Sequence, residues 1–328
     1  MRVLRRILLG LLCLLLGAWG AAALWFDGPA SRPLAGVLAA VFFLAVLILP
    51  QRSTRGLVFA GVLFAGLLAW WSSIAPSNDR NWLPDVAKPA TVVFEGDRVT
   101  IHNVRNFTYR SETDYTPHWE TRTYDLSQVR GLDLFLSYWS SPTIAHTIMS
   151  WDFGDAPPLA ISIETRKEVG EEYSAVRGFF RQFELYYVVA DERDVIRLRT
   201  DFRNEQVYLY RLAASPERAR QLLVSYLKEV DHLAKHPEWY NAFSHNCTTT
   251  IRLHVIQIGV PQPFDWRMLA NGYIDEMLYE RGAINTSLPF PELRAASNVT
   301  DKAKVAGDAP DFSAQIRVGL PGRPARQP

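Results

Sequence analysis

Three uninterrupted apolar runs near the N-terminus constrain this chain more than any other feature of its sequence. The runs extend over residues 7–25, 34–49 and 56–74, and no charged residue falls inside them. A helix of about 20 apolar residues is long enough to cross the hydrocarbon core of a bilayer. We therefore expect residues 1–76 to form a membrane anchor of three transmembrane helices. A cleaved signal peptide is the alternative for the first run, but the other two runs would still hold the chain in the membrane.

The arginines that flank these runs predict the orientation of the anchor. The N-terminus and the loop between the second and third runs lie on the same side of the membrane. That side carries five arginines, Arg2, Arg5, Arg6, Arg52 and Arg55, whereas the loop on the other side carries one, Arg32. Short loops rich in arginine and lysine remain in the cytoplasm. The pattern therefore predicts a bacterial inner-membrane protein with a cytoplasmic N-terminus, whose chain lies in the periplasm from about residue 78 onward.

Strand patterns follow the anchor, after a linker over residues 77–89 that contains two prolines. Short runs that alternate apolar and polar residues are typical of strands with one buried face. Such runs fall at residues 91–94, 98–104, 119–126, 132–138, 144–153, 159–166, 185–189 and 206–212. A turn signal at Gly154 and Asp155 lies between the fifth and sixth runs, which predicts that these two strands form a hairpin.

Helix patterns come after the strand patterns. Ser215 can cap a first helix, whose apolar residues recur at helical spacing. Two more helices are expected over residues 247–258 and 266–281. Strands followed by helices predict an α+β domain over residues 90–295. The tail over residues 296–328 lacks periodicity, and we expect it to be disordered.

The composition excludes several classes of function. The 35 basic and 34 acidic residues nearly balance and form no basic stripe, so nucleic-acid binding is not expected. No histidine or cysteine cluster has the spacing of a zinc site, and the sequence contains no phosphate-binding loop. We therefore expect neither a metal nor a cofactor.

Cys247 is the candidate nucleophile. The other cysteine, Cys13, lies far away in the first apolar run, so a disulfide is not expected. A cysteine in the first turn of a helix lies among unpaired amides at the positive end of the helix dipole, which favours the thiolate and can hold an oxyanion. Its neighbours His245, Asn246 and Thr248 are candidates for oxyanion binding or for tuning the thiol. The alternative is a small buried core residue.

A nucleophilic thiol needs a base, and His146 is the candidate because it lies in an apolar strand. A hairpin symmetric about Asp155 places His146 opposite Glu164, where a carboxylate can orient an imidazole. A register shift of two residues would substitute Ser162 or Arg166 for Glu164. Two alternatives stay open: His146 as a core histidine bonded to backbone, and Glu164 as a surface carboxylate paired with a nearby cation.

Several segments between residues 82 and 258 together form a recognisable pattern. They are residues 103–110, His146 with residues 151–153, and residues 162–166, 184–187, 197–200, 207–210, 237–241 and 246–248. In this order they resemble the periplasmic domain first described at the N-terminus of Lnb, the Bacteroides lipoprotein N-acyltransferase. The resemblance implies a permuted papain-like thiol domain with an antiparallel sheet and packed helices, in which the histidine strand precedes the cysteine helix.

The resemblance also implies a function. It points to a membrane-anchored thiol acyltransferase or hydrolase that acts through Cys247, His146 and Glu164, with lipoproteins or phospholipid as its partners. Two other functions stay open: a cell-wall peptide amidase on the same fold, and a non-enzymatic periplasmic binding or scaffold module with a structural thiol. The sequence predicts no substrate-binding residue.

Overall fold

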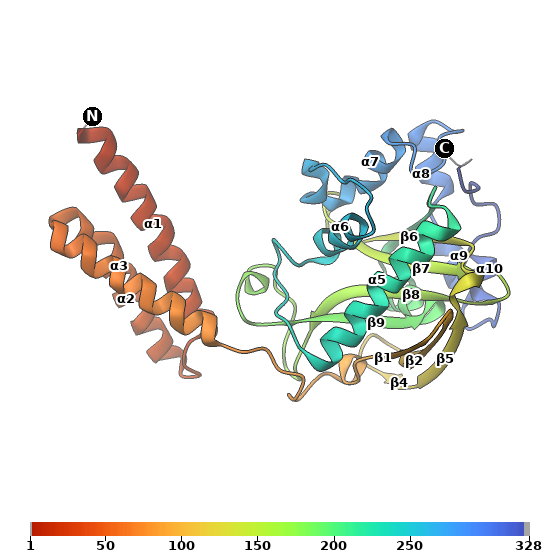
Figure 1. Cartoon of the computed structure of the whole chain (residues 1–328), viewed down its shortest axis with the longest axis horizontal. Coiled ribbons are helices and arrows are strands. Elements are labelled where there is room, and N and C mark those ends of the chain that lie inside the picture. The colour runs from red at the N-terminus through yellow and green to blue at the C-terminus, as the bar shows by residue number, and fades with distance from the viewer. Residues whose placement is uncertain (1, 325–328) are drawn as a thin grey trace. The chain divides into compact units, whose positions relative to one another are not determined.

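The computed structural model describes residues 2–324 and divides the chain into two compact units (Figure 1). One unit contains the first 77 residues together with the loops Glu172–Glu184 and Glu238–Ala242. The other unit contains the rest of the chain and, with it, every residue proposed from the sequence for the site.

The first unit is built on three apolar helices. They are α1 (Arg2–Asp27), α2 (Arg32–Arg52) and α3 (Thr54–Ser73). All three are long and apolar enough to cross a membrane, with mean hydropathies of 2.4, 2.5 and 1.7. Cys13 of α1 packs against Phe42 of α2 and Leu67 of α3. The three apolar helices expected from the sequence are therefore present.

The second unit is organised around an eight-stranded, mainly antiparallel sheet. Its strands are β1 (Thr91–Glu95), β2 (Arg98–Arg105), β5 (Trp119–Asp125), β6 (Gly131–Tyr138), β7 (His146–Phe153), β8 (Ala156–Arg166), β9 (Glu184–Asp191) and β10 (Gln206–Arg211). The strand order is β1-β2-β9-β8-β7-β6-β10, and β5 pairs with β2. Only β2 and β9 pair in parallel among the described strand pairs. A separate small hairpin joins β3 (Thr108–Tyr109) and β4 (Tyr115–Thr116).

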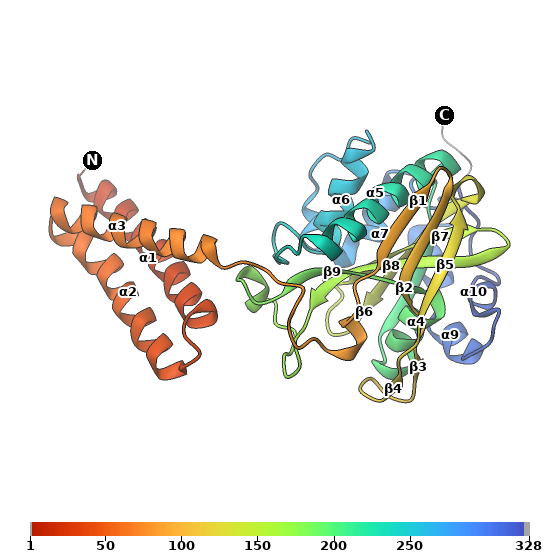
Figure 2. The same cartoon turned by 60° about the horizontal axis from the view of Figure 1, so that its bottom comes forward.

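Helices cover both faces of this sheet. They are α4 (Glu192–Arg197), a π-helical turn η4 (Leu198–Phe202), α5 (Pro216–Lys235), α6 (Cys247–Gln257), α7 (Ile274–Glu280), α8 (Phe290–Ala296), α9 (Thr300–Ala306) and α10 (Phe312–Gln315). Figures 1 and 2 show α5 and α6 on one face, and α4, α9 and α10 on the other. The α+β architecture expected from the sequence is confirmed.

Strand β7 shows why its two faces meet different helices. Side chains of a strand alternate between faces. Trp151 points toward α5, where its indole Nε1 donates to the Ala219 carbonyl at 2.8 Å. Ser150 points the other way and donates to Glu192 of α4 at 2.7 Å. Even-numbered residues of β7 therefore face α4, and odd-numbered residues face α5 and α6.

The expected continuous helix over residues 266–281 is wrong. The chain instead makes two 3-10 turns, η5 (Trp266–Met268) and η6 (Asn271–Tyr273), before α7 begins. Gly272 explains the break, because its amide donates to the Thr143 carbonyl at 3.0 Å in the loop before β7. A Cβ at this glycine would lie 2.2 Å from the Pro142 carbonyl oxygen, so only glycine permits the approach.

The expected disorder of residues 296–328 is also wrong for the part that the structure describes. Helices α9 and α10 lie in this segment, and Ala303, Phe312 and Ile316 are buried in the core on the α4 face of the sheet. Arg317 reaches the buried carboxylates of Asp133 and Glu192, at 2.8 and 2.6 Å. These partners are 184 and 125 residues away in the chain. Such distant pairs leave no local periodicity, which is why the sequence pattern did not reveal them.

Candidate functional site

Cys247 is the first residue of α6, as expected. The Asn246 side chain caps the helix by accepting from the Thr249 amide at 2.9 Å, and the Thr249 hydroxyl accepts from the Asn246 amide at 3.0 Å. This capping box fixes the helix start. A helix makes no internal use of its first amides, so those of Cys247 and Thr248 remain for a ligand.

The thiol of Cys247 is half-buried and lies beside two polar side chains. Its Sγ is 3.9 Å from the Thr248 hydroxyl and 3.9 Å from Nδ2 of Asn271. Asn271 also donates to the Thr248 hydroxyl at 2.9 Å. His245, proposed as a tuning residue, is bonded through Nδ1 to the Ser244 hydroxyl at 2.9 Å.

The second group of predicted residues meets on the β7–β8 hairpin. The hairpin has the register expected from its turn, since Ser150 pairs with Ala160 and Ile148 with Ser162. The Ser162 hydroxyl lies 2.6 Å from His146 Nε2 and donates to Glu164 at 2.8 Å. Nε2 of His146 is 3.6 Å from the same carboxylate oxygen. Because Ser162 has a single proton to donate, His146 carries its proton on Nε2.

Arg199 of η4 completes this buried network. It contacts Glu164 at 3.0 Å and Glu205 at 3.0 Å. Burial and the charge of Arg199 outweigh the attraction of Glu164 and lower the pKa of His146 to about 3. Burial alone would raise the pKa of Glu164, but Arg199 and His146 reverse this and hold it well below its usual value.

The structure brings His146 and Glu164 together and leaves Cys247 apart from both. The His146 ring lies on the α4 face of the sheet with Ser162, whereas α6 packs on the opposite face. The described contacts of Cys247 do not include the imidazole. A link exists through Asn271, which bonds both the backbone of Ala145, adjacent to His146, and the N-terminal turn of α6.

The network predicts that His146 stays neutral down to acidic pH. Its folded-state pKa lies below the value of about 6.5 for an exposed histidine, so the unfolded chain binds this proton more readily. The stability contributed by neutral His146 is therefore complete above about pH 6.5 and declines as the pH falls toward 3. Histidine C2 hydrogen exchange, followed by mass spectrometry, measures this pKa. Arg199→Met should raise the pKa of His146, and Arg193→Met should leave this pKa unchanged. Equal pKa values in the two variants would contradict the role of Arg199 in lowering it.

An apolar cavity of about 650 Å³ lies beside the helix that carries the thiol. Its walls include Leu134 and Met149 of the sheet, Ile251 and Val255 of α6, and Met277 of α7. A cavity whose walls are mainly apolar suits an apolar ligand, such as a hydrocarbon chain.

The thiol and three cations lie near this cavity. Thr248, the residue after Cys247, forms part of the lining. Arg218, Arg252 and Arg281 also contribute to it. The cavity therefore combines an apolar interior with positive charge, next to the helix that begins with Cys247.

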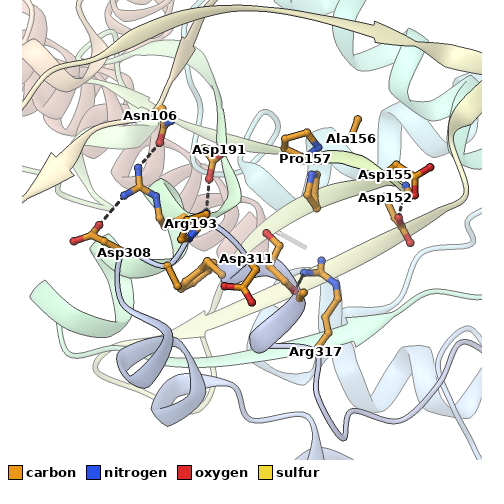
Figure 3. A pocket seen from close by; sticks show the side chains of 17 residues that line it. Asn106, Asp152, Asp155, Ala156, Pro157, Asp191, Arg193, Asp308, Asp311 and Arg317 are labelled. Carbon is orange, nitrogen blue, oxygen red and sulfur yellow. Dashed lines mark hydrogen bonds and ion pairs between the residues drawn. The ribbon is translucent and has the colours of Figure 1, made fainter.

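A second cavity, of about 580 Å³, lies between the β7–β8 turn and the segment around α10 (Figure 3). Figure 3 shows Arg193 between Asn106 and Asp308, and Arg193 bonds these partners at 2.5 and 2.6 Å. Arg317 is bonded to Asp133 and Glu192. Both arginines are thus engaged within the protein, as are Arg252 and Arg281 of the apolar cavity. The apolar cavity is the better candidate because its lining includes Thr248, the residue after Cys247. Residues 2–324 contain no group of three or more acidic, histidine or cysteine side chains able to hold a metal ion.

Sequence reasoning missed two residues of the site. Asn271 was placed inside a helix, although Asn271-Gly272 is a turn signal that could have marked the break. Arg199 is not singled out by the sequence. No local pattern distinguishes it from the arginines around it, because its partners Glu164 and Glu205 are set by the packing of η4 on the sheet.

Comparison with known proteins agrees with this architecture. Residues 115–272 match the family model of the Lnb N-terminal periplasmic domain, a range that includes His146, Glu164, Cys247 and Asn271. No curated protein and no solved structure matches the chain. Residues 115–272 thus form a domain of the Lnb N-terminal periplasmic domain family, and with three apolar N-terminal helices the chain is a membrane-anchored protein with a periplasmic domain.

Proposed function

We propose that this protein is a thiol acyltransferase or hydrolase that acts on a lipid-linked acyl group at the membrane surface. The observation that carries the proposal is the position of Cys247, at the first turn of α6 beside the apolar cavity. The match to the Lnb N-terminal periplasmic domain family supports a site in the periplasm. The arginine distribution supports an inner-membrane anchor with a cytoplasmic N-terminus.

The reaction has two halves. Cys247 gives its proton to a base, its sulfur bonds to the acyl carbon, and the carbon–oxygen bond of the donor breaks as the donor alcohol takes that proton. The amides of Cys247 and Thr248 hold the oxyanion. A lipoprotein α-amine or a water molecule then attacks the thioester, the carbon–sulfur bond breaks, and the thiol recovers a proton.

His146 is the base in this proposal, with Glu164 and Ser162 as the residues that hold its ring at rest. The ring must leave Ser162 to approach the thiol. His146 is the first residue of β7, and its neighbour Ala145 is bonded to Asn271, which also contacts the sulfur. Because the ring and the thiol lie on opposite faces of the sheet, rotation of the side chain alone does not bring them together; His146 at the end of β7 would have to leave the strand for its ring to reach the thiol. Outside the buried network, the imidazole also regains basicity.

The apolar cavity would hold the acyl chain. Burial of each methylene of a fatty chain is worth about 0.8 kcal/mol, so a cavity lined by Leu134, Met149 and Val255 favours a long chain. The exposed Arg218 at the start of α5 would attract an anionic headgroup, whereas Arg252 and Arg281 are already bonded to Gln262 and Asp265. Phospholipid as donor and a lipoprotein as acceptor fit these walls and charges.

Filling the cavity is expected to abolish use of long-chain donors. Val255→Trp places an indole in the cavity, and Ile256→Trp is the matched control, because Ile256 of the same helix is 40% exposed and lies outside the lining. In nanodiscs that contain phospholipid with a labelled acyl chain, Val255→Trp should lower turnover about tenfold or more, in line with the loss of several buried methylenes. Ile256→Trp should retain turnover.

The same assay separates the alternatives. Equal turnover in both tryptophan variants would contradict the placement of the chain. Absence of acyl turnover together with cleavage of peptidoglycan peptides would favour the cell-wall amidase. Absence of both reactions, with a Cys247 thiol inert to alkylating agents, would favour a scaffold.

A further inference from the structure

The three membrane helices leave a groove between them, toward the end of the bundle that leads to the periplasmic domain. Its volume is about 730 Å³, and its walls include Leu24 of α1, Phe42 of α2, and Leu63 and Trp70 of α3. Among the described residues that line this groove, only Asp27 carries a charge. Walls of this kind suit part of the acyl chain of a membrane lipid, which packs against helices by van der Waals contact.

Asp27 is the last residue of α1, and neutral donors hold its carboxylate. Oδ2 accepts from the Trp71 indole at 2.7 Å and from the Arg181 backbone amide at 3.2 Å, and Oδ1 accepts from the Gln182 side chain at 2.7 Å. A carboxylate has about four acceptor sites, so one site on Oδ1 remains. No cation of the described chain forms an ion pair with Asp27, which leaves its negative charge available to a ligand.

Arg181 supplies a cation at the same end of the groove. It lies in the loop Glu172–Glu184 of this unit, and its guanidinium stacks on Trp71, with Cζ 4.2 Å from the ring centroid and 5.8 Å from that of Trp239. Nε is buried without a hydrogen-bond partner, and no carboxylate among residues 2–324 pairs with this side chain. An arginine stacked on an aromatic ring keeps its planar fork of N–H donors available for a phosphate.

We propose that the groove binds a phospholipid with a zwitterionic headgroup, such as phosphatidylethanolamine. One acyl chain packs against the helices, the phosphate binds Arg181 and the ammonium binds Asp27. A separate anion and cation that do not pair with each other match the two charges of this headgroup, and tryptophans such as Trp70 and Trp71 are typical of the depth at which headgroups lie. The inference does not rest on the proposed function, because lipid binding can be measured without turnover.

Native mass spectrometry of the full chain in detergent tests the headgroup site. The chain is titrated with phosphatidylethanolamine or with phosphatidylglycerol, which has the phosphate but no ammonium, and the two lipids carry identical acyl chains. The wild type should bind phosphatidylethanolamine about threefold more tightly. Arg181→Met should weaken the binding of both lipids about fivefold, the usual effect of one arginine near a headgroup. Asp27→Asn should remove the preference without weakening the binding of phosphatidylglycerol.

Matched variants control for charge and for the acyl chain. Arg80→Met removes a cation that is already paired with Glu168 at 2.9 Å, and it should leave both affinities unchanged. A Cβ added at Gly66 or at Gly61 of α3 meets no atom within 4 Å, but of the two only Gly66 lines the groove. Gly66→Leu should therefore weaken both lipids at least about threefold through lost van der Waals contact, whereas Gly61→Leu should not.

Three results would overturn the proposal. Equal affinities of the wild type for the two lipids, a result that needs no variant, would show that lipid coats the helices without a headgroup site. Equal effects of Arg181→Met and Arg80→Met would exclude Arg181 from the site. Equal effects of Gly66→Leu and Gly61→Leu would exclude the groove. Variants are compared only where their thermal unfolding matches that of the wild type.

Discussion

Cys247→Ser should abolish formation of the acyl-enzyme and lower acyl turnover at least about a thousandfold. Serine is nearly isosteric with cysteine, but its hydroxyl stays protonated at neutral pH and needs a base in contact to become a nucleophile. In the resting structure His146 is bonded to Ser162 and makes no such contact. The loss should therefore appear in the chemical step, with the cavity and donor binding unchanged.

The purified full chain is incubated with nanodiscs that contain phospholipid with a labelled acyl chain. The amount of label that hydroxylamine releases from the protein then measures the acyl-enzyme. Cys13→Ala is the control, because Cys13 packs within the membrane helices and should retain labelling and turnover. Two results would contradict the assignment of Cys247 as the nucleophile. One is turnover at the wild-type rate in Cys247→Ser, and the other is acyl labelling of the protein in Cys247→Ala.

Arg317→Met should destabilise the periplasmic domain by about 3–5 kcal/mol, the usual cost when one partner of a buried ion pair is removed. Arg317 bonds Glu192 and Asp133, whose side chains are completely buried. Methionine fills much of the space but leaves the Glu192 carboxylate with neutral hydroxyl donors, Ser150 and Ser313, in place of a cation. For a domain of this size the change corresponds to a fall in melting temperature of about 10 °C.

The effect should depend on pH with a definite sign. Burial alone would raise the pKa of Glu192, but Arg317 outweighs it and holds the pKa below its usual value. The stability that this pair contributes is therefore present above about pH 4.5 and is lost as the pH falls through the folded-state pKa. In Arg317→Met the carboxyl can protonate instead, so the deficit should shrink in mild acid.

Thermal unfolding and hydrogen exchange of β6 and α4 measure these changes in the full chain. Arg130→Met is the control, since Arg130 is exposed and pairs with the exposed Asp155 at 3.6 Å. An exposed pair of this kind is worth about 0–1 kcal/mol. Equal effects of the two substitutions, or a deficit in Arg317→Met that does not change with pH, would contradict the role of the buried pair.

Much of the fold could be predicted because its signals are local. The turn at Gly154 and Asp155, with the two-residue period of strands, set the hairpin register and so the pairing of His146 with Glu164. The helix predicted to begin at Cys247 does begin there, as α6. These features depend on neighbours within a few residues or on one short hairpin.

The rest of the site depends on contacts between distant segments. The alternation of β7 says which residues share a face but not which helix covers that face, so the separation of His146 from Cys247 was not visible in the sequence. Asn271 and Arg199 acquire their roles only when a turn and a π-helical segment pack against the sheet. The three apolar helices could be predicted more easily, because a membrane-spanning helix requires only a sufficient length and an apolar composition and does not depend on a particular contact partner.

The attachment of the C-terminal segment to β6 has a consequence for biosynthesis. Arg317 and Arg323 close on Asp133, a carboxylate of β6 that no solvent reaches. A nascent chain therefore lacks these two partners of Asp133, and has only Arg211 to pair with it, until almost 200 further residues have been exported. Translation products that stop short of Arg317 should be cleared by envelope proteases, which makes the tail a checkpoint for complete synthesis.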